Sequence, residues 1–62
     1  MNSIEELEAS IRANLEALKL SLADSPVSFN AQVCGSIGYY IGFCHAKNWD
    51  RNLDFIVWME KL

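Results

Sequence analysis

The chain has 62 residues, a formal net charge of −3 and a hydrophobic content of 52%. A single hydrophobic core is marginal at this length, and so much apolar surface is more than a short monomer can cover, which favours a homodimer. The few basic residues are scattered along the chain, so no basic patch supports direct nucleic-acid binding. We expect one small helical domain over residues 1–62 and an all-α fold of three helices.

The first predicted helix covers residues 3–23. Ser3 and Glu6 have the spacing of a capping box, in which Ser3 caps the first free amides and Glu6 reaches back. Apolar residues then recur at steps of three and four, which places them on one helix face. These residues are Ile4, Leu7, Ile11, Leu15, Leu18 and Leu22. The charged residues between them are expected to form a solvated face.

The stretch Asp24-Ser25-Pro26 should end this helix, because proline cannot continue the hydrogen-bond ladder and the residue before it avoids the helical region. Ser25 and Pro26 also fit the N-cap and first position of a second helix, with Ser28 as an alternative cap. We place the second helix at residues 28–47. The short connection makes the two helices an antiparallel hairpin.

The second predicted helix holds all three glycines and both cysteines of the chain. Successive helical residues turn by about 100°, so one face of this helix carries only residues without side-chain bulk. We call this face the small-residue stripe; it consists of Ala31, Gly35, Gly38, Gly42 and Ala46. Each glycine in a helix interior costs about 1 kcal/mol relative to alanine. The stripe therefore predicts close contact with another helix, and we assign it to a dimer interface.

A strand over residues 33–44 is the alternative, because bulky and small residues alternate between Ile37 and Cys44. No second convincing strand and no hairpin signal is found, so such a strand would have to pair with another chain. Glycines weaken a central strand, whereas their spacing by three and four has a use in a helix. The helix is therefore favoured.

The stretch Lys47-Asn48-Trp49-Asp50 is either a second break or only a kink. Asn48 or Asp50 can cap a third helix, which we place at residues 50–61. Apolar residues cover most of its circumference, which predicts burial on several sides. A short strand over residues 55–59 is the alternative.

No residue pattern indicates catalysis or metal binding. His45 directly follows Cys44, and helical neighbours point about 100° apart, so the two do not form a nucleophile–base pair. Together with Cys34 they lack the spacing of structural zinc sites. Asp50 and Asp54 have no histidine or lysine cluster to tune them. We expect a non-enzymatic protein without cofactor or metal.

Cys34 and Cys44 lie about 15 Å apart along one helix, too far for a disulfide. Two buried thiols suit a reducing compartment, and no signal peptide opens the chain, so we expect a cytoplasmic protein. A membrane-associated protein is the alternative, because residues 25–46 are uncharged and Gly38 and Gly42 have the small-xxx-small spacing of membrane helix pairs. Polar residues within this segment argue against a span.

Large aromatic side chains serve either as core residues or as anchors for a binding partner. The anchors that we select are Tyr39, Trp49 and Trp58. Without a catalytic pattern, the sequence favours protein–protein interaction, by a small regulatory or adaptor protein that occupies a partner's surface as a homodimer. A dimeric regulator linked to transcription is a further alternative.

The small size, the N-terminal helix capped at Ser3 and the compact apolar C-terminal half resemble the small helical accessory proteins encoded in the early regions of lambda-like temperate phages. The resemblance is one of architecture and involves no diagnostic motif. It implies a host-directed regulatory role, and it assigns no functional residue.

Overall fold

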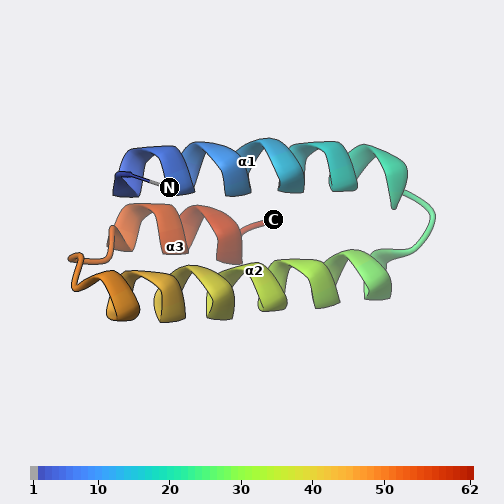
Figure 1. Ribbon diagram of the computed structural model, residues 1–62. Helices are drawn as coiled ribbons and strands as arrows, with labels where there is room; N and C mark the ends of the chain where they lie inside the picture. Colours follow the sequence, from blue (N-terminus) through green and yellow to red (C-terminus); the bar gives the residue numbers. More distant parts are fainter. Residues whose placement is uncertain (1) are drawn as a thin grey trace.

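The computed structural model describes residues 2–62 and contains three helices joined by two short connections (Figure 1). The helices are α1 (Ile4–Ser21), α2 (Pro26–Lys47) and α3 (Leu53–Glu60). α1 and α2 run antiparallel, and α3 lies against them at the end where α1 begins and α2 ends. Residues 2–62 contain no strand, so the all-α prediction is confirmed and the strand alternatives over 33–44 and 55–59 are wrong.

α1 begins at the predicted cap. The Ser3 Oγ accepts a hydrogen bond from the backbone N–H of Glu6 at 3.2 Å. The Glu6 carboxylate reaches one residue further back than in a capping box, and accepts from the N–H of Asn2 at 3.4 Å. The helix ends at Ser21, slightly before the predicted end at residue 23.

α2 begins at Pro26, earlier than the predicted residue 28, with Ser25 at the N-cap position. The Ser25 side chain makes no capping hydrogen bond. The start of α2 therefore depends on proline, whose fixed φ suits the first helical position and whose missing N–H needs no partner there.

α2 ends as predicted at Lys47. The turn that follows ends the helix and is not merely a kink within it. Asn48 has a left-handed backbone, with φ 58° and ψ 40°. The N–H of Trp49 donates to the Cys44 carbonyl at 2.9 Å, and the N–H of Asn48 donates to the His45 carbonyl at 3.2 Å. This pair of bonds is the Schellman motif, which asparagine tolerates because its cost in the left-handed region is small. Asn48 therefore terminates α2 and does not cap α3.

α3 begins at Leu53 and not at Asp50, so the predicted range 50–61 starts too early. Its N-cap is Asn52, whose Oδ1 accepts from the N–H groups of Asp54 and Phe55 at 3.1 and 3.3 Å. Asp50 lies in the connection between the two helices, so it does not share a helix face with Asp54.

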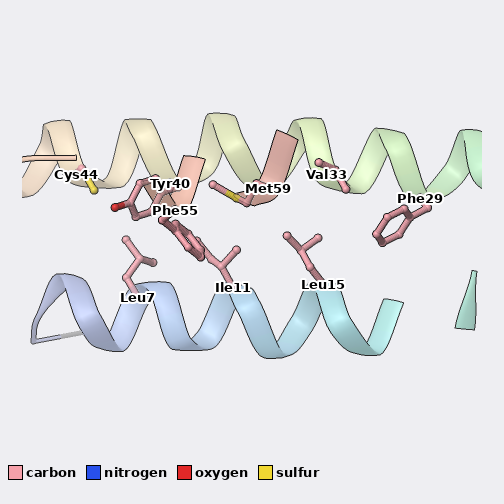
Figure 2. Packing of buried hydrophobic residues seen from close by; sticks show 9 residues of the cluster. All are labelled: Leu7, Ile11, Leu15, Phe29, Val33, Tyr40, Cys44, Phe55 and Met59. Carbon is pink, nitrogen blue, oxygen red and sulfur yellow. The ribbon is translucent and has the colours of Figure 1, made fainter. Parts of the chain in front are cut away.

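The core lies between the three helices (Figure 2). Its fully or nearly fully buried members are Leu7, Ile11 and Leu15 of α1, Phe29, Val33, Tyr40 and Cys44 of α2, and Phe55 and Met59 of α3. Burying one large apolar side chain contributes about 1.5–3 kcal/mol, so this cluster is the main source of stability. The inner side of α1 is the one expected from its helical periodicity.

α3 is buried on one side only, which corrects the expectation that it is covered on several sides. Phe55 and Met59 are 1% and 0% exposed, whereas Leu53 and Val57 are 69% and 43% exposed. α3 packs against the α1–α2 hairpin with one face, and no other element of the described chain covers its outer face. A helix that is apolar all round thus leaves apolar side chains at the surface.

Candidate functional site

The small-residue stripe lies on the outer side of α2. Its residues, Ala31, Gly35, Gly38, Gly42 and Ala46, are all exposed. A Cβ atom built on any of the three glycines would meet no atom of the described chain within 4 Å, apart from immediate neighbours and the helix's own backbone. The helix contact that the stripe predicts is therefore not made within one chain. The space above the glycines is open.

The outer side of α2 also carries no formal charge, because no charged residue occurs between Pro26 and Ala46. Val27 is 83% exposed and Tyr39 is 54% exposed. Cys34 is exposed too, so of the two thiols expected to be buried only Cys44 is. Surface helices of soluble proteins normally place charged residues on the face opposite the core, and α2 does not.

The uncharged surface continues into an open groove between α1 and α2. Its lining residues are Ser10, Ile11, Asn14, Gln32, Gly35, Ser36 and Tyr39. The polar groups among them are neutral hydroxyls and amides. The groove therefore extends the surface of the small-residue stripe toward α1 without adding a charge.

A second open pocket lies at the turn between α2 and α3. It is lined by Ile41, Cys44, His45, Asn48, Trp49, Asp50, Arg51 and Leu53. Its lining is mixed, because Ile41 and Leu53 are apolar whereas Asp50 and Arg51 are charged. Neither this pocket nor any other part of residues 2–62 gathers three His, Cys, Asp or Glu side chains that could hold a metal ion.

Two of the three predicted anchors belong to one aromatic row that runs along the end of α2 into the turn after it. The ring centroids of Tyr39 and Phe43 lie 5.7 Å apart, and those of Phe43 and Trp49 lie 5.8 Å apart. The Lys47 Nζ lies 5.9 Å from the Phe43 centroid, within reach of a cation–π interaction. Tyr39 is the exposed member of the row, and Trp49 is half-buried.

The third predicted anchor, Trp58, packs α3 against α1. Its ring stacks on Phe55 with a centroid distance of 5.6 Å and an interplanar angle of 14°. The guanidinium of Arg12 lies 4.3 Å from the Trp58 centroid and 5.1 Å from the Phe55 centroid. Arg12, which the sequence placed only on a solvated face, thus contacts both rings and links α1 to α3.

A polar joint made of Glu8, Tyr40 and Asn52 connects the three helices at one end. The Tyr40 hydroxyl donates to Glu8 Oε2 at 2.8 Å and accepts from the N–H of Asn52 at 3.0 Å. The Asn52 Nδ2 donates to Glu8 Oε1 at 3.4 Å. The joint was not predicted from the sequence, because its members are far apart along the chain.

Burial raises the pKa of Tyr40 far above its ordinary value. The hydrogen bond from the Asn52 backbone acts in the opposite direction, while the adjacent Glu8 carboxylate raises the pKa further. The hydroxyl is therefore protonated at neutral pH and donates a hydrogen bond to Glu8. Within the joint the hydroxyl links α1 to the start of α3 by hydrogen bonds.

Comparison of the chain with models of protein families, with curated proteins and with solved structures finds no significant match. No helix within residues 2–62 combines the length and the hydropathy that crossing a membrane requires.

Proposed function

We propose that this is a non-enzymatic interaction protein that works as a homodimer and pairs through the outer side of α2. One observation carries the proposal: the small-residue stripe is exposed, uncharged and open above each of its glycines. Three glycines lower the intrinsic stability of a helix by about 3 kcal/mol relative to alanine. Close packing of a second helix offsets that loss, because glycine lets two backbones approach.

The size of the molecule supports a second copy as the occupant. A standard interface buries about 800 Å² on each partner, and the smallest stable ones about 600 Å². The Cα positions span 37 × 17 × 15 Å, so one long side measures roughly 630 Å². The stripe alone is too small, so the proposed interface also includes exposed neighbours of the stripe on α2, such as Val27 and Tyr39, and the groove beside α1.

Charge also favours α2 over α1 as the pairing surface. α1 carries four glutamates, and those at positions 5, 6 and 16 are exposed, so two α1 helices would bring like charges together. Two α2 helices would meet without any charge between them. A two-fold interface uses the same patch twice, so an uncharged patch is the one that suits it.

The role that we propose for the dimer is regulatory: it occupies the surface of a cytoplasmic protein partner. Trp49, the half-buried member of the aromatic row, is the anchor that we assign to that partner. Tyr39 lies close enough to the stripe to take part in the dimer interface. The resemblance to phage accessory proteins is the basis for proposing that the partner is a host protein.

The homodimer is tested by the variant Gly38→Leu and light scattering coupled to size exclusion. We expect the parent protein to have twice the chain mass and the variant to have the mass of one chain. The variant should keep its helical circular dichroism, because no described atom outside its own turn of helix stands near the new side chain. The matched control is Ala13→Leu, at an exposed position of α1, which should remain dimeric.

Two results would contradict the proposal. One is a parent protein with the mass of a single chain at the highest soluble concentration. The other is a Gly38→Leu variant that stays folded and dimeric, because a leucine at the centre of the stripe must separate two closely packed helices.

A further inference from the structure

We infer that α3 is a latch that folds and docks in one step, and that Asn52 couples the two events. In the closed form, which the structure shows, α3 is helical and attached to both other helices. In the open form α3 is released and unfolded while the α1–α2 hairpin stays folded. This inference goes beyond the proposed homodimer and does not depend on it.

α3 is too short, and too poor in helix-forming residues, to be stable by itself. It has eight residues, whereas isolated helices shorter than about 12–15 residues are marginal in water. Its four consecutive residues at positions 55–58 are all aromatic or β-branched, and these types have a lower helix propensity than alanine or leucine. The helical order of α3 therefore comes from its contacts with α1 and α2.

Asn52 makes the hydrogen bonds that start α3 and also those that attach it. Its Oδ1 accepts from the N–H groups of Asp54 and Phe55, which caps the helix. Its Nδ2 donates to Glu8 of α1, and its backbone N–H donates to the Tyr40 hydroxyl of α2. A carboxamide carries an acceptor and donors on one planar group, so a single orientation of this side chain serves both purposes. Loss of the attachment therefore also frees the cap.

The apolar contacts of α3 are made by side chains of one short helix. Phe55 and Met59 lie about one turn apart on its inner face, and the Phe55 ring meets Tyr40 edge-on with a centroid distance of 4.9 Å. Trp58 stacks on Phe55 and contacts the guanidinium of Arg12. When α3 unfolds, all these contacts with the hairpin are lost together.

Opening uncovers an apolar surface that the closed form hides. Tyr40, Phe55 and Met59 are at most 1% exposed in the closed form. Release of α3 gives solvent access to the inner face of α3 and to the part of the hairpin that it covers. The hydrogen bonds between Asn52 and the other two helices thus control whether this surface is accessible.

Amide hydrogen exchange of the full chain tests the latch. In the parent protein, the amides of residues 57–60 should exchange through one common opening, and faster than those in the middle of α1. Phe29→Leu, far from α3 along the hairpin (Figure 2), should speed exchange in the hairpin and leave exchange in α3 unchanged. If this variant speeds both equally, α3 opens only when the whole chain unfolds, and the inference fails.

The coupling by Asn52 is tested by exchanging donor and acceptor across the joint. Asn52→Asp keeps a capping oxygen, because aspartate caps helices as well as asparagine does, but it sets a second carboxylate against Glu8. We expect α3 to open about tenfold more often or more. Adding Glu8→Gln supplies an amide nitrogen that can donate to the new carboxylate and an oxygen that can still accept from Tyr40. Opening in this double variant should return to within about threefold of the parent.

Two results would contradict the role of Asn52. Unchanged exchange in α3 of Asn52→Asp would show that docking does not depend on the bond to Glu8. Equally fast exchange in the single and double variants would show that the substitution acts on the cap alone. If α3 is fully unfolded in Asn52→Asp, the milder Asn52→Ser, which keeps a capping oxygen but lacks the amide nitrogen, is compared with the parent instead.

Discussion

α1 and α2 pack side by side, and each has an apolar inner side. Their outer sides differ in charge. α1 carries four glutamates, an arginine and a lysine, and most of them face solvent. α2 is longer and has no charged residue before Lys47. Covering a charged side removes ionic groups from water at a high cost, whereas covering the outer side of α2 removes none. This difference is the reason for proposing α2, and not α1, as the helix with a second contact face.

The largest expected effect is on the inner side of α2. Phe29→Ala should lower the free energy of unfolding by about 3–5 kcal/mol, because Phe29 is buried at 8% exposure and the variant leaves a cavity. Denaturant titration at a concentration that keeps the protein monomeric measures this. Val27→Ala, on the outer side, should change it by less than about 0.5 kcal/mol. Equal losses would erase the distinction between the two sides. Phe29→Leu gives a milder version if the alanine variant is unfolded.

Tyr40→Phe should cost about 1–3 kcal/mol, because it leaves the N–H of Asn52 and the carboxylate of Glu8 without their shared partner. Tyr39→Phe removes the same hydroxyl from an exposed ring and should have almost no effect on the monomer. Thermal unfolding of both variants against the parent compares them. A neutral Tyr40→Phe would show that the polar joint does not hold the helices together.

The pKa of Tyr40 also predicts how stability varies with pH. Above about pH 10 the unfolded chain ionises this tyrosine, while the folded chain, with its raised pKa, keeps the proton. Stability should therefore fall as the pH rises, by at most about 1.4 kcal/mol per pH unit from this group. Denaturation at pH values around 9 to 11 should show a shallower fall for Tyr40→Phe. Parallel curves for parent and variant would contradict the burial of the hydroxyl.

The smallest expected effect has the opposite sign. Gly35→Ala should raise the stability of the dilute monomer by about 1 kcal/mol, because the added Cβ meets nothing and alanine favours the helix. Ala13→Gly, on the outer side of α1, is the reciprocal control and should lose a similar amount. If Gly35→Ala destabilises the dilute protein, the stripe is covered within one chain and the comparison between the two helices fails.

Periodicity and capping signals were sufficient for α1 and for the turn that separates it from α2. Ser3 caps α1, and Pro26 starts α2. Of the apolar residues at steps of three and four in and just after α1, the central three are buried and the outer three are partly buried. These features depend on neighbours within one or two turns, which is the range over which a sequence pattern carries information.

The start of α3 was misplaced for a tertiary reason. Asn48 and Asn52 both suit turns and caps, and the sequence does not say which of them caps α3. The choice depends on contacts with other helices, since the N–H of Asn52 reaches Tyr40 of α2 and its side chain reaches Glu8 of α1. A buried tyrosine usually needs a hydrogen-bond partner, which was the one available signal for this joint.

The exposure of Leu53, Val57 and Cys34 was missed for a related reason. Residue type predicts burial correctly only where another element is present to cover the side chain. α3 covers one side of the hairpin, and the outer side of α2 has no cover within the described chain. The exposed apolar residues thus lie where no other helix of the described chain covers them.

The polar joint lies at one end of the molecule, and this position has a consequence for local unfolding. α3 spans eight residues, about 12 Å, against the roughly 33 Å of α2, so the half of α2 near Phe29 packs against α1 alone. Transient opening should therefore begin at the connection between α1 and α2 and stop at Tyr40. Amide hydrogens in the first turns of α2 should exchange with solvent well before those around Cys44. We therefore expect the end of the molecule at the α1–α2 connection to open more often than the end at the polar joint.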